Sequence, residues 1–275
     1  MSAGAPPCDA ASSTDGDVRI ERRGDVAWMV LDRPPLNLFT LPLIHRLRAA
    51  VDAVRAEPGV RALVITGAGR AMTGGMQVQV LRGLDPGSAK ALISALHEAI
   101  QAVHEAPFPT VAMINGACLG AGFELAMACD LRVASTEARL GLPEVRVGIP
   151  SVIEAALLPA LVGPGRAAEL LLTGEAVTAD QALAWGLVNR VATPAALESV
   201  ATGLVEAITA CAPSAIRLQK ELIIRWRNTD LATAIAYGIN AFAQSMTSDD
   251  AREAMQAFLD KRPPRFRTER GAGRS

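Results

Sequence analysis

Two glutamates, Glu124 and Glu144, stand out because each comes directly after a segment whose composition predicts burial. The stretch that holds them reads TVAMINGACLGAGFELAMACDLRVASTEARLGLPE. It predicts a strand at 110–114, a glycine-rich bend at 115–122, a short helix carrying Glu124 and a strand from Asp130. Ionised side chains are rarely placed in such segments without a partner or a catalytic purpose. Two carboxyl groups can act as general acid and general base when burial and mutual repulsion separate their pKa values.

The composition of the whole chain narrows the class of protein. With 275 residues, the chain is long for one domain but fits one large α/β domain with an appendage. Hydrophobic residues make up 50% and charged residues 20%, which is ordinary for a globular protein. The formal net charge is −1, so no nucleic acid or other polyanion is expected as a partner.

The cysteines and the apolar stretches predict a cytoplasmic protein. The four cysteines, Cys8, Cys118, Cys129 and Cys211, show no CxxC spacing, which indicates reduced thiols with no disulfide framework and no metal site. The stretch 111–129 is almost entirely apolar, but it contains a glutamate and lacks basic flanks. It therefore predicts core and not a membrane span.

The chain is expected to divide into three parts. Residues 1–17 are small, polar and proline-bearing, which predicts a disordered tail, and they lack the features of a signal or transit peptide. Residues 18–193 alternate strand and helix patterns, with glycine-rich loops at strand ends, which is how α/β folds build sites. Residues 194–275 predict a helical region, with helices at 194–210, 213–227, 230–246 and 248–260.

Turn and cap signals set the expected boundaries in the middle part. Thr40 is expected to cap a helix that ends at Pro58-Gly59. Ser151 and Glu154 have the spacing of a capping box that opens another helix. The other expected elements are strands at 18–21, 26–31 and 61–66, an edge strand within 186–191, a broken helix at 77–105, and short helices at 166–172 and 178–185.

Five ordered motifs extend across most of the chain. They are RAMTGGMQ at 70–77, INGACLGAGFELAMACDLRVA at 114–134, LGLPEVRVGIP at 140–150, LLTGEAVTADQALAWGLVNRV at 171–191 and EAMQAFLDKRPPRF at 253–266. Together they resemble the crotonase superfamily of enoyl-CoA hydratases and isomerases. The resemblance implies an α/β fold, a crotonase-like spiral of ββα repeats with a C-terminal helical trimerisation region. It also implies a homotrimer, or a hexamer made of two trimers.

The resemblance implies an acyl-CoA thioester substrate. Its carbonyl oxygen would be held by the backbone N–H groups of Met76 and Ala121, whose fixed dipoles would stabilise the enolate as charge develops. Glu124 would activate a water for attack on the β-carbon, and Glu144 would give a proton to the α-carbon. No separate cofactor is expected, because coenzyme A is part of the substrate.

Coenzyme A itself is expected to lie along the loops 33–38 and 68–76, with the adenine near 68–70. Lys261 could meet the phosphates, including those bound to a neighbouring subunit, or could equally be a solvated helix end. The residues expected to contact the substrate or coenzyme A are Arg33, Leu36, Asn37, Ala68, Arg70, Thr73, Gly74, Gly120 and Lys261.

Two segments depart from the pattern of the family. Gly74-Gly75-Met76-Gln77 stands where the family often has Ala-Gly-Ala-Asp, which keeps the backbone donor but adds a bulky, flexible side chain. Pro150-Ser151-Val152-Ile153-Glu154 stands where Pro-Gly-Ala-Gly-Gly is frequent. Glu154 is interpreted as the capping-box partner of Ser151, and the bulk of Val152 and Ile153 is expected to reshape the acyl pocket.

The presence of both carboxylates favours a hydratase. Double-bond isomerases of the family generally keep only the acid/base at the Glu144 position and often lose the other carboxylate. An isomerase, another crotonase-type acyl-CoA lyase and a non-catalytic CoA-binding protein stay as alternatives, although non-catalytic members usually lose a glutamate.

The sequence lacks the motifs of two unrelated enzyme classes, dinucleotide-binding dehydrogenases and serine hydrolases. GAGRAM at 67–72 differs from the dinucleotide-binding GxGxxG at its last position, and no GxSxG of a serine hydrolase is present. His45, His97 and His104 all fall in predicted helices and are interpreted as surface or packing residues.

Overall fold

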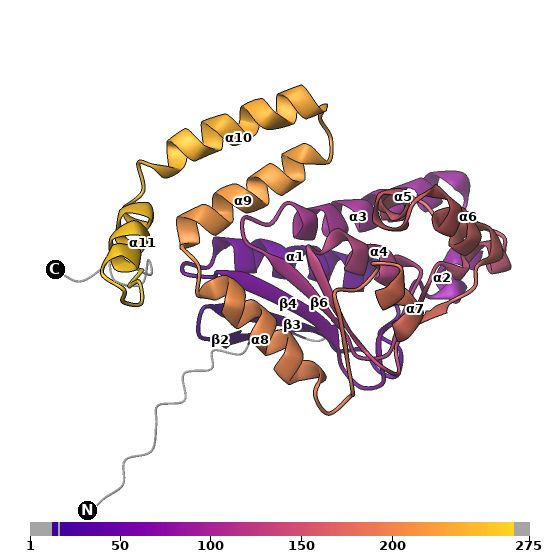
Figure 1. The fold of residues 1–275 in the computed structure, drawn as a ribbon. Coiled ribbons are helices and arrows are strands. Elements are labelled where there is room, and N and C mark those ends of the chain that lie inside the picture. The colour runs from indigo at the N-terminus through magenta and orange to yellow at the C-terminus, as the bar shows by residue number, and fades with distance from the viewer. Residues whose placement is uncertain (1–12, 16, 267–275) are drawn as a thin grey trace, which may run out of the picture.

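The computed structural model describes residues 13–15 and 17–266, which form an α/β fold around two sheets. The strands are β1 (Ser13–Asp15), β2 (Val18–Arg23), β3 (Val26–Leu31), β4 (Ala62–Gly67), β5 (Ala71–Thr73), β6 (Thr110–Ile114), β7 (Ala117–Leu119), β8 (Leu131–Ser135), β9 (Arg139–Gly141), β10 (Val177–Thr178) and β11 (Arg190–Ala192). Seven strands form one sheet, in the order β1-β2-β3-β4-β6-β8-β11, and four form the other, in the order β10-β9-β7-β5 (Figure 1).

Both sheets mix parallel and antiparallel pairs. In the larger sheet β1, β2 and β3 are antiparallel, and the pairs from β3 to β11 are parallel. In the smaller sheet β7 runs parallel to β5 and β9, and β10 is antiparallel to β9. Ser13 of β1 pairs with Ile20 of β2. The rest of the predicted disordered tail, residues 1–12 and 16, lies outside the described residues.

Helices and 3₁₀ turns fill the connections between the strands. They are α1 (Leu41–Ala56), α2 (Val78–Arg82), α3 (Pro86–His104), α4 (Ala121–Ala128), η1 (Pro143–Val147), η2 (Ile153–Leu157), α5 (Leu158–Val162), α6 (Pro164–Thr173), α7 (Ala179–Ala184), α8 (Leu197–Thr209), α9 (Pro213–Trp226), α10 (Leu231–Ser245) and α11 (Asp249–Leu259). The predicted broken helix consists of α2, which ends before Gly83, and α3, which begins at Pro86. The four predicted C-terminal helices are confirmed as α8–α11.

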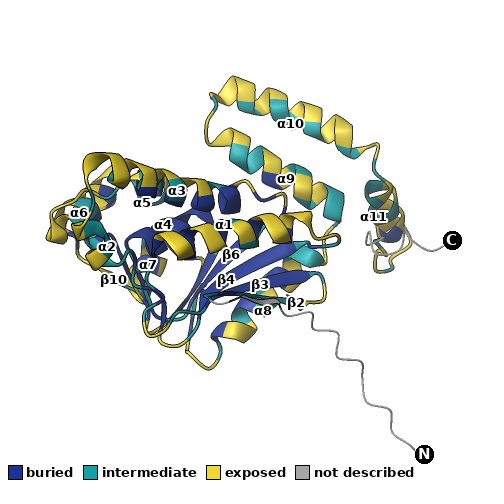
Figure 2. Cartoon of the chain, turned by 180° about the vertical axis from the view of Figure 1, so that it is seen from behind, coloured by how far each residue is buried: buried dark blue, intermediate teal, exposed yellow. Residues whose placement is uncertain are grey.

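Side chains alternate between the two faces of the larger sheet along its strands, and helices cover both faces. Met29 and Leu31 of β3 join a core with residues of α1 and α3, whereas Trp28 joins Leu197 and Ala201 of α8 on the other face. Figure 2 shows the strands as a buried layer beneath α1 and α3. This layer fixes the strand ends from which the glycine-rich loops start.

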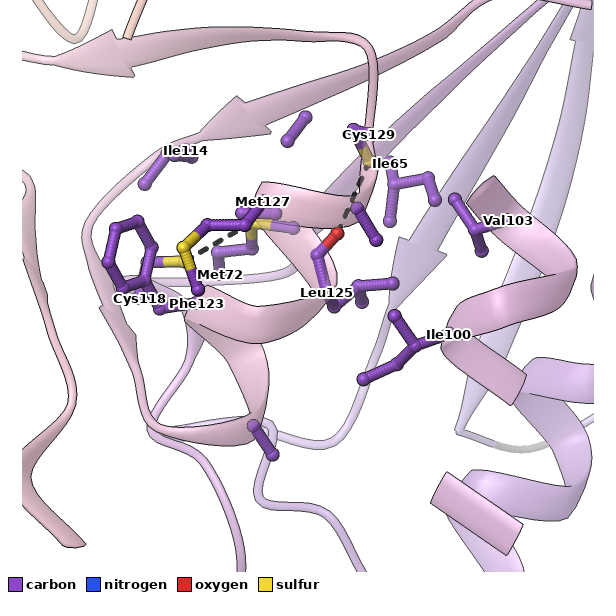
Figure 3. Close-up of a cluster of buried hydrophobic side chains, with 14 of the residues drawn as sticks. Ile65, Met72, Ile100, Val103, Ile114, Cys118, Phe123, Leu125, Met127 and Cys129 are labelled. Atoms are coloured by element: carbon purple, nitrogen blue, oxygen red, sulfur yellow. Dashed lines mark hydrogen bonds between the residues drawn. The ribbon is translucent and has the colours of Figure 1, made fainter. Parts of the chain in front are cut away.

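All of α4 is buried, which explains the apolar composition of its sequence. Figure 3 shows Phe123 beside Cys118 on one side of the helix and Leu125 facing Ile100 of α3 on another. Cys118 and Cys129 are buried free thiols, as the sequence predicts for apolar segments. The helix is therefore a rigid support for its one charged residue, Glu124.

The helices α9, α10 and α11 extend beyond the two sheets (Figure 1). A buried ion pair anchors α9, with Lys220 Nζ 2.7 Å from Asp130 Oδ1 at the start of β8. Figure 2 shows α10 mostly exposed. Its exposed apolar residues follow helical spacing and are Leu231, Ile235, Ile239 and Phe242.

Two predicted helix caps differ from the prediction, because their side chains bind other partners. Thr40 is the N-cap of α1 without a side-chain cap bond, because its hydroxyl accepts a hydrogen bond from Arg33 at 3.0 Å. The capping box predicted for Ser151 and Glu154 is wrong. The N-cap of η2 is Val152, and Ser151 and Glu154 instead bind two distant residues of the site described below.

Within the described ranges, no single helix is long and apolar enough to cross a membrane. The helices α8 and α9, which are bent against each other, are long and apolar enough only when their lengths are added together.

Candidate active site

A cavity of about 190 Å³ opens between the glycine-rich loops, α2, α3, α4 and η1. Of the residues predicted for the site, it brings together Glu124, Glu144, Met76, Ala121, Gly74 and Gly120. The remaining lining residues are Gly75, Val78, Leu81, Ile93, Leu96, Pro143, Arg146, Val147, Ile149, Pro150 and Val152. Most of these wall residues are apolar, so the cavity suits a ligand with an aliphatic part.

Glu124 lies in the first turn of α4 and is 3% exposed. Its Oε1 accepts a hydrogen bond from the backbone N–H of Ala155 at 3.2 Å. Burial, followed by the negative charges of Glu144 and Glu154, raises the pKa of Glu124 to about 8, against the opposing effect of the Ala155 hydrogen bond. This raised pKa favours the protonated form of Glu124 at neutral pH.

Glu144 lies in η1, on the opposite wall of the cavity from the body of α4. The Ser151 hydroxyl donates a hydrogen bond to its Oε2 at 2.8 Å. Gly120 packs directly against the carboxyl group, where a Cβ would collide with Oε1. Gly120 also has φ +53°, a conformation that suits glycine, so side-chain space and backbone both require this residue type.

Met76 and Ala121, the two residues predicted to supply backbone N–H donors, both line the cavity. Met76 follows Gly75, which has φ +88°, and Ala121 is the first residue of α4. Phe39 bonds to the carbonyl of Gly75 at 2.9 Å and accepts from Gln77 at 3.0 Å, which holds the loop on both sides of Met76. Among the described residues, neither the Met76 N–H nor the Ala121 N–H has an acceptor.

Asn37 and Thr73 are placed differently from the prediction that they contact coenzyme A, because both are fully buried. The Asn37 amide donates to the carbonyls of Ala68, Ala71 and Met72 at 3.0, 2.9 and 3.2 Å. It therefore joins the two loops predicted to grip coenzyme A. Thr73 accepts a hydrogen bond from the Gly75 N–H at 3.1 Å and so shapes the loop that carries Met76.

The other predicted coenzyme A contacts lie outside the cavity. Arg33 donates to the Leu38 carbonyl at 3.2 Å, Leu36 accepts from the Gly74 N–H at 2.8 Å, and Arg70 is exposed. Ala68 belongs to the loop that Asn37 ties down. Lys261 follows α11, at the far end of the molecule from α2 in Figures 1 and 2, so this chain does not bring it to its own cavity.

Three polar groups that hydrogen-bond to Glu124, Glu144 or Glu154 were not predicted to belong to the site. They are the Ala155 N–H, the Ser151 hydroxyl and His97, whose Nδ1 lies 2.7 Å from Glu154 Oε1. The only local signal is the departure at 150–154, which places a serine and a glutamate where small residues are frequent. Within residues 17–266, no group of three His, Cys, Asp or Glu residues could hold a metal ion.

The fold and the cavity define a crotonase-type protein, with two mixed sheets, C-terminal helices and a glycine-lined pocket holding two carboxyls. A family model described as enoyl-CoA hydratase/isomerase matches residues 21–269. The chain therefore belongs to the enoyl-CoA hydratase/isomerase family, the crotonase superfamily.

Individual relatives agree with this assignment. The chain is 32% identical over 249 residues to a short-chain-enoyl-CoA hydratase of Clostridium acetobutylicum, covering 90% of this chain and 95% of the relative. It is 32% identical over 253 residues to a crotonyl-CoA hydratase of Syntrophomonas wolfei, covering 91% and 97%. The crystal structure of an enoyl-CoA hydratase from Bacillus anthracis superposes with a TM-score of 0.87 at 32% identity, covering 91% of this chain and 99% of that one.

Proposed function

We propose that the protein is an enoyl-CoA hydratase, which adds water across the α,β double bond of an acyl-CoA thioester. The observation that carries the proposal is one cavity lined by two glutamates and by Met76 and Ala121, whose backbone N–H groups have no acceptor within the described part of the chain. Enoyl thioesters need this combination, because the reaction places negative charge on the carbonyl oxygen and moves two protons.

In the proposed mechanism, the Met76 and Ala121 N–H groups donate to the thioester oxygen. Glu124 takes a proton from water as the water oxygen bonds to the β-carbon, and the π electrons move to form the enolate. The enolate then collapses as Glu144 gives a proton to the α-carbon. Glu124 ends protonated and Glu144 ends ionised, and the pair exchanges one proton to return to its starting state.

The raised pKa of Glu124 supports a defined starting state for the reverse reaction. Burial and the negative charge of Glu144 keep the proton on Glu124 at neutral pH, because they raise its pKa to about 8. This is the arrangement that dehydration needs, with Glu144 taking the α-proton and Glu124 giving a proton to the departing hydroxyl. Hydration starts after the proton has moved to Glu144.

The assembly is proposed as a homotrimer or as a hexamer of two trimers. The support is the exposed apolar row on α10 and further exposed apolar residues on α11, Phe258 and Leu259, which extend beyond the sheets. Exposed apolar surface of this kind marks protein–protein contact. Such an assembly would also give Lys261 a cavity of a neighbouring subunit to reach.

Purified protein with a panel of 2-enoyl-CoA thioesters tests the proposal. A hydratase removes the conjugated double bond, so the ultraviolet absorbance of the enoyl thioester should fall and the 3-hydroxyacyl-CoA should appear by mass spectrometry. A 3-enoyl-CoA converted to its 2-enoyl isomer, with no water added to either, would instead assign the isomerase reaction. Binding without turnover would assign a non-catalytic CoA-binding protein.

The variant Glu144→Gln tests the site. It should lower kcat by roughly 10²–10⁴, the usual contribution of a positioned general acid or base. Acyl-CoA binding, measured by calorimetry, should persist because the amide is nearly isosteric. Unchanged turnover in this variant would remove Glu144 from the mechanism.

A further inference from the structure

One short segment, residues 151–155, touches both carboxyl groups of the cavity. At its start the Ser151 hydroxyl donates to Glu144 at 2.8 Å, and at its end the Ala155 N–H donates to Glu124 at 3.2 Å. The relative position of the two carboxyls therefore depends on the conformation of these five residues.

That conformation is strained at its centre. Ile153 has φ +42°, and a β-branched residue rarely adopts the left-handed region unless its surroundings hold it there. Val152 on its N-terminal side lines the cavity with an exposed side chain, and its carbonyl accepts a hydrogen bond from the Ala155 N–H at 2.9 Å within the turn. Ile153 itself packs against the main core, and a side-chain contact to another element would hold the turn further.

Glu154 supplies a contact of that kind. It is 6% exposed, and its Oε1 lies 2.7 Å from Nδ1 of His97 on α3. Among the described residues, its Oε2 has no hydrogen-bond partner. A carboxyl group buried in this way is costly, and it is retained only where a partner and a position compensate. His97 is half-exposed, so the pair connects the buried turn to the surface of α3.

The charged groups around Glu124 act on one another in sequence, from His97 to Glu154 and from Glu154 to Glu124. Glu144 from η1 and Glu154 from η2 both act on Glu124, and each raises its pKa. His97 from α3 is the charged or polar partner that acts on Glu154, where it opposes the rise in pKa caused by burial. The helix α3 packs against both α4 and η2, so this pair lies behind the wall that carries Glu124.

We propose that His97 and Glu154 form a positioning pair, which holds the strained turn 151–155 so that Ser151 and Ala155 fix the two carboxyls. The pair acts through those two contacts and touches no substrate atom. Its effect on turnover rests on the proposed hydratase function, but its effect on Glu124 does not.

The test uses His97→Leu, His97→Asn and Glu154→Gln in the full chain, with His45→Ala as the matched control, since His45 is an exposed histidine on the neighbouring helix α1. His97→Leu should lower kcat by roughly tenfold to a hundredfold with KM within about twofold, because the carboxyls lose their alignment. His97→Asn should restore most of kcat, because its amide can still donate to Glu154. The control should match the wild type.

A second readout needs no turnover. The carboxyl of Glu124 is titrated by infrared or carbon NMR spectroscopy with isotope-labelled glutamate, and Glu124→Gln identifies its signal. Glu154→Gln removes a neighbouring negative charge, so the pKa of Glu124 should fall by roughly one unit.

Two results would overturn the proposal. One is a Glu124 titration that is unchanged in Glu154→Gln. The other is a loss of kcat that is equal in His97→Leu and His97→Asn, which a merely structural role would produce. If the protein shows no hydratase activity, the titration still decides the question, so failure of the proposed function and failure of the pair are told apart.

Discussion

At the scale of single residues, Glu124 shows how burial and charge decide the state of a carboxyl group. It is placed in a fully buried helix, where hydrogen bonding to backbone groups of the 151–155 segment, including the Ala155 N–H, compensates it in part. Its pKa of about 8 has two consequences, one for chemistry and one for stability. The chemical consequence is that neutral pH favours the protonated form, which suits the reverse reaction, dehydration, whereas hydration needs Glu124 ionised.

The stability consequence is measurable. Because the folded-state pKa of Glu124 is raised from 4.5 to about 8, its contribution to stability is fully present below pH 4.5 and is lost as the pH rises towards 8. We expect the free energy of unfolding of the wild type to fall relative to Glu124→Gln across that window, by roughly 1.4 kcal/mol per pH unit. Urea unfolding of both proteins at matched concentration measures the difference, and parallel pH curves would contradict the raised pKa.

Gly120 gives a second prediction at this scale. In Gly120→Ala, the new methyl group would meet Glu144 Oε1, and a residue with a side chain would adopt φ +53°. We expect kcat to fall by roughly a hundredfold, because Glu144 must move away from its Ser151 partner. Steady-state kinetics measure this. Gly165→Ala is the control, since a Cβ there meets open space, and equal activity of the two variants would show that Glu144 adapts without loss.

At the scale of elements, the long helices and buried strands could be predicted from the sequence, but the small sheet could not. Apolar periodicity was sufficient for α1, α3 and the four C-terminal helices, and short apolar runs were sufficient for β3, β4 and β6. The strands β5, β7, β9 and β10 contain two or three residues each, so they carry no pattern of alternation. They form because larger elements bring them together.

The site shows the same limit. Motif positions were sufficient to place Glu124, Glu144, Met76 and Ala121 at one cavity. Spacing suggested that Ser151 and Glu154 cap a helix, but Glu144 and His97 are their partners, and His97 is 57 positions from Glu154. Local spacing cannot reveal a partner that only the tertiary fold supplies.

The anchor of α9 leads to a prediction about this element. Lys220 is almost fully buried and is bound by both oxygens of Asp130, which also accepts a hydrogen bond from the Thr110 N–H. Lys220→Met should destabilise the fold by about 3–5 kcal/mol, because it leaves a buried carboxylate without its cation. Chemical unfolding measures this change.

A surface ion pair on the same helix is the control for this prediction. Arg225 and Glu221 are both more than 40% exposed, so Arg225→Met should cost much less stability than Lys220→Met. Similar losses in the two variants would show that Lys220 does not anchor α9.

At the scale of the whole molecule, the described chain ends in a region that buries little of its own apolar surface. Phe242 on α10 is 70% exposed and Phe258 on α11 is 83% exposed. The cavity beside α4 is also lined by residues of α2 and α3, and α2 lies at the opposite end of the molecule from α11 (Figure 1). One end therefore carries the proposed chemistry, and the other end offers surface for a second copy of the chain.

The exposed row on α10 predicts how the assembly responds to mutation. Phe242→Glu should convert the proposed trimer or hexamer into smaller species, because it places a charge within apolar contact surface. Sedimentation or light scattering measures the mass, and Glu206→Gln on α8 is a conservative surface control. A wild-type monomer, or a variant with unchanged mass, would contradict this use of α10.

The two carboxyls of the cavity differ in how deeply their backbones are embedded. Every residue of α4 is buried, so its amide hydrogens should exchange with deuterium only when the whole domain unfolds. The turn η1 has no buried residue, and its amides should exchange through local opening. In mild denaturant, Glu144 should therefore leave its place while Glu124 keeps its own, and activity should disappear before the fold does.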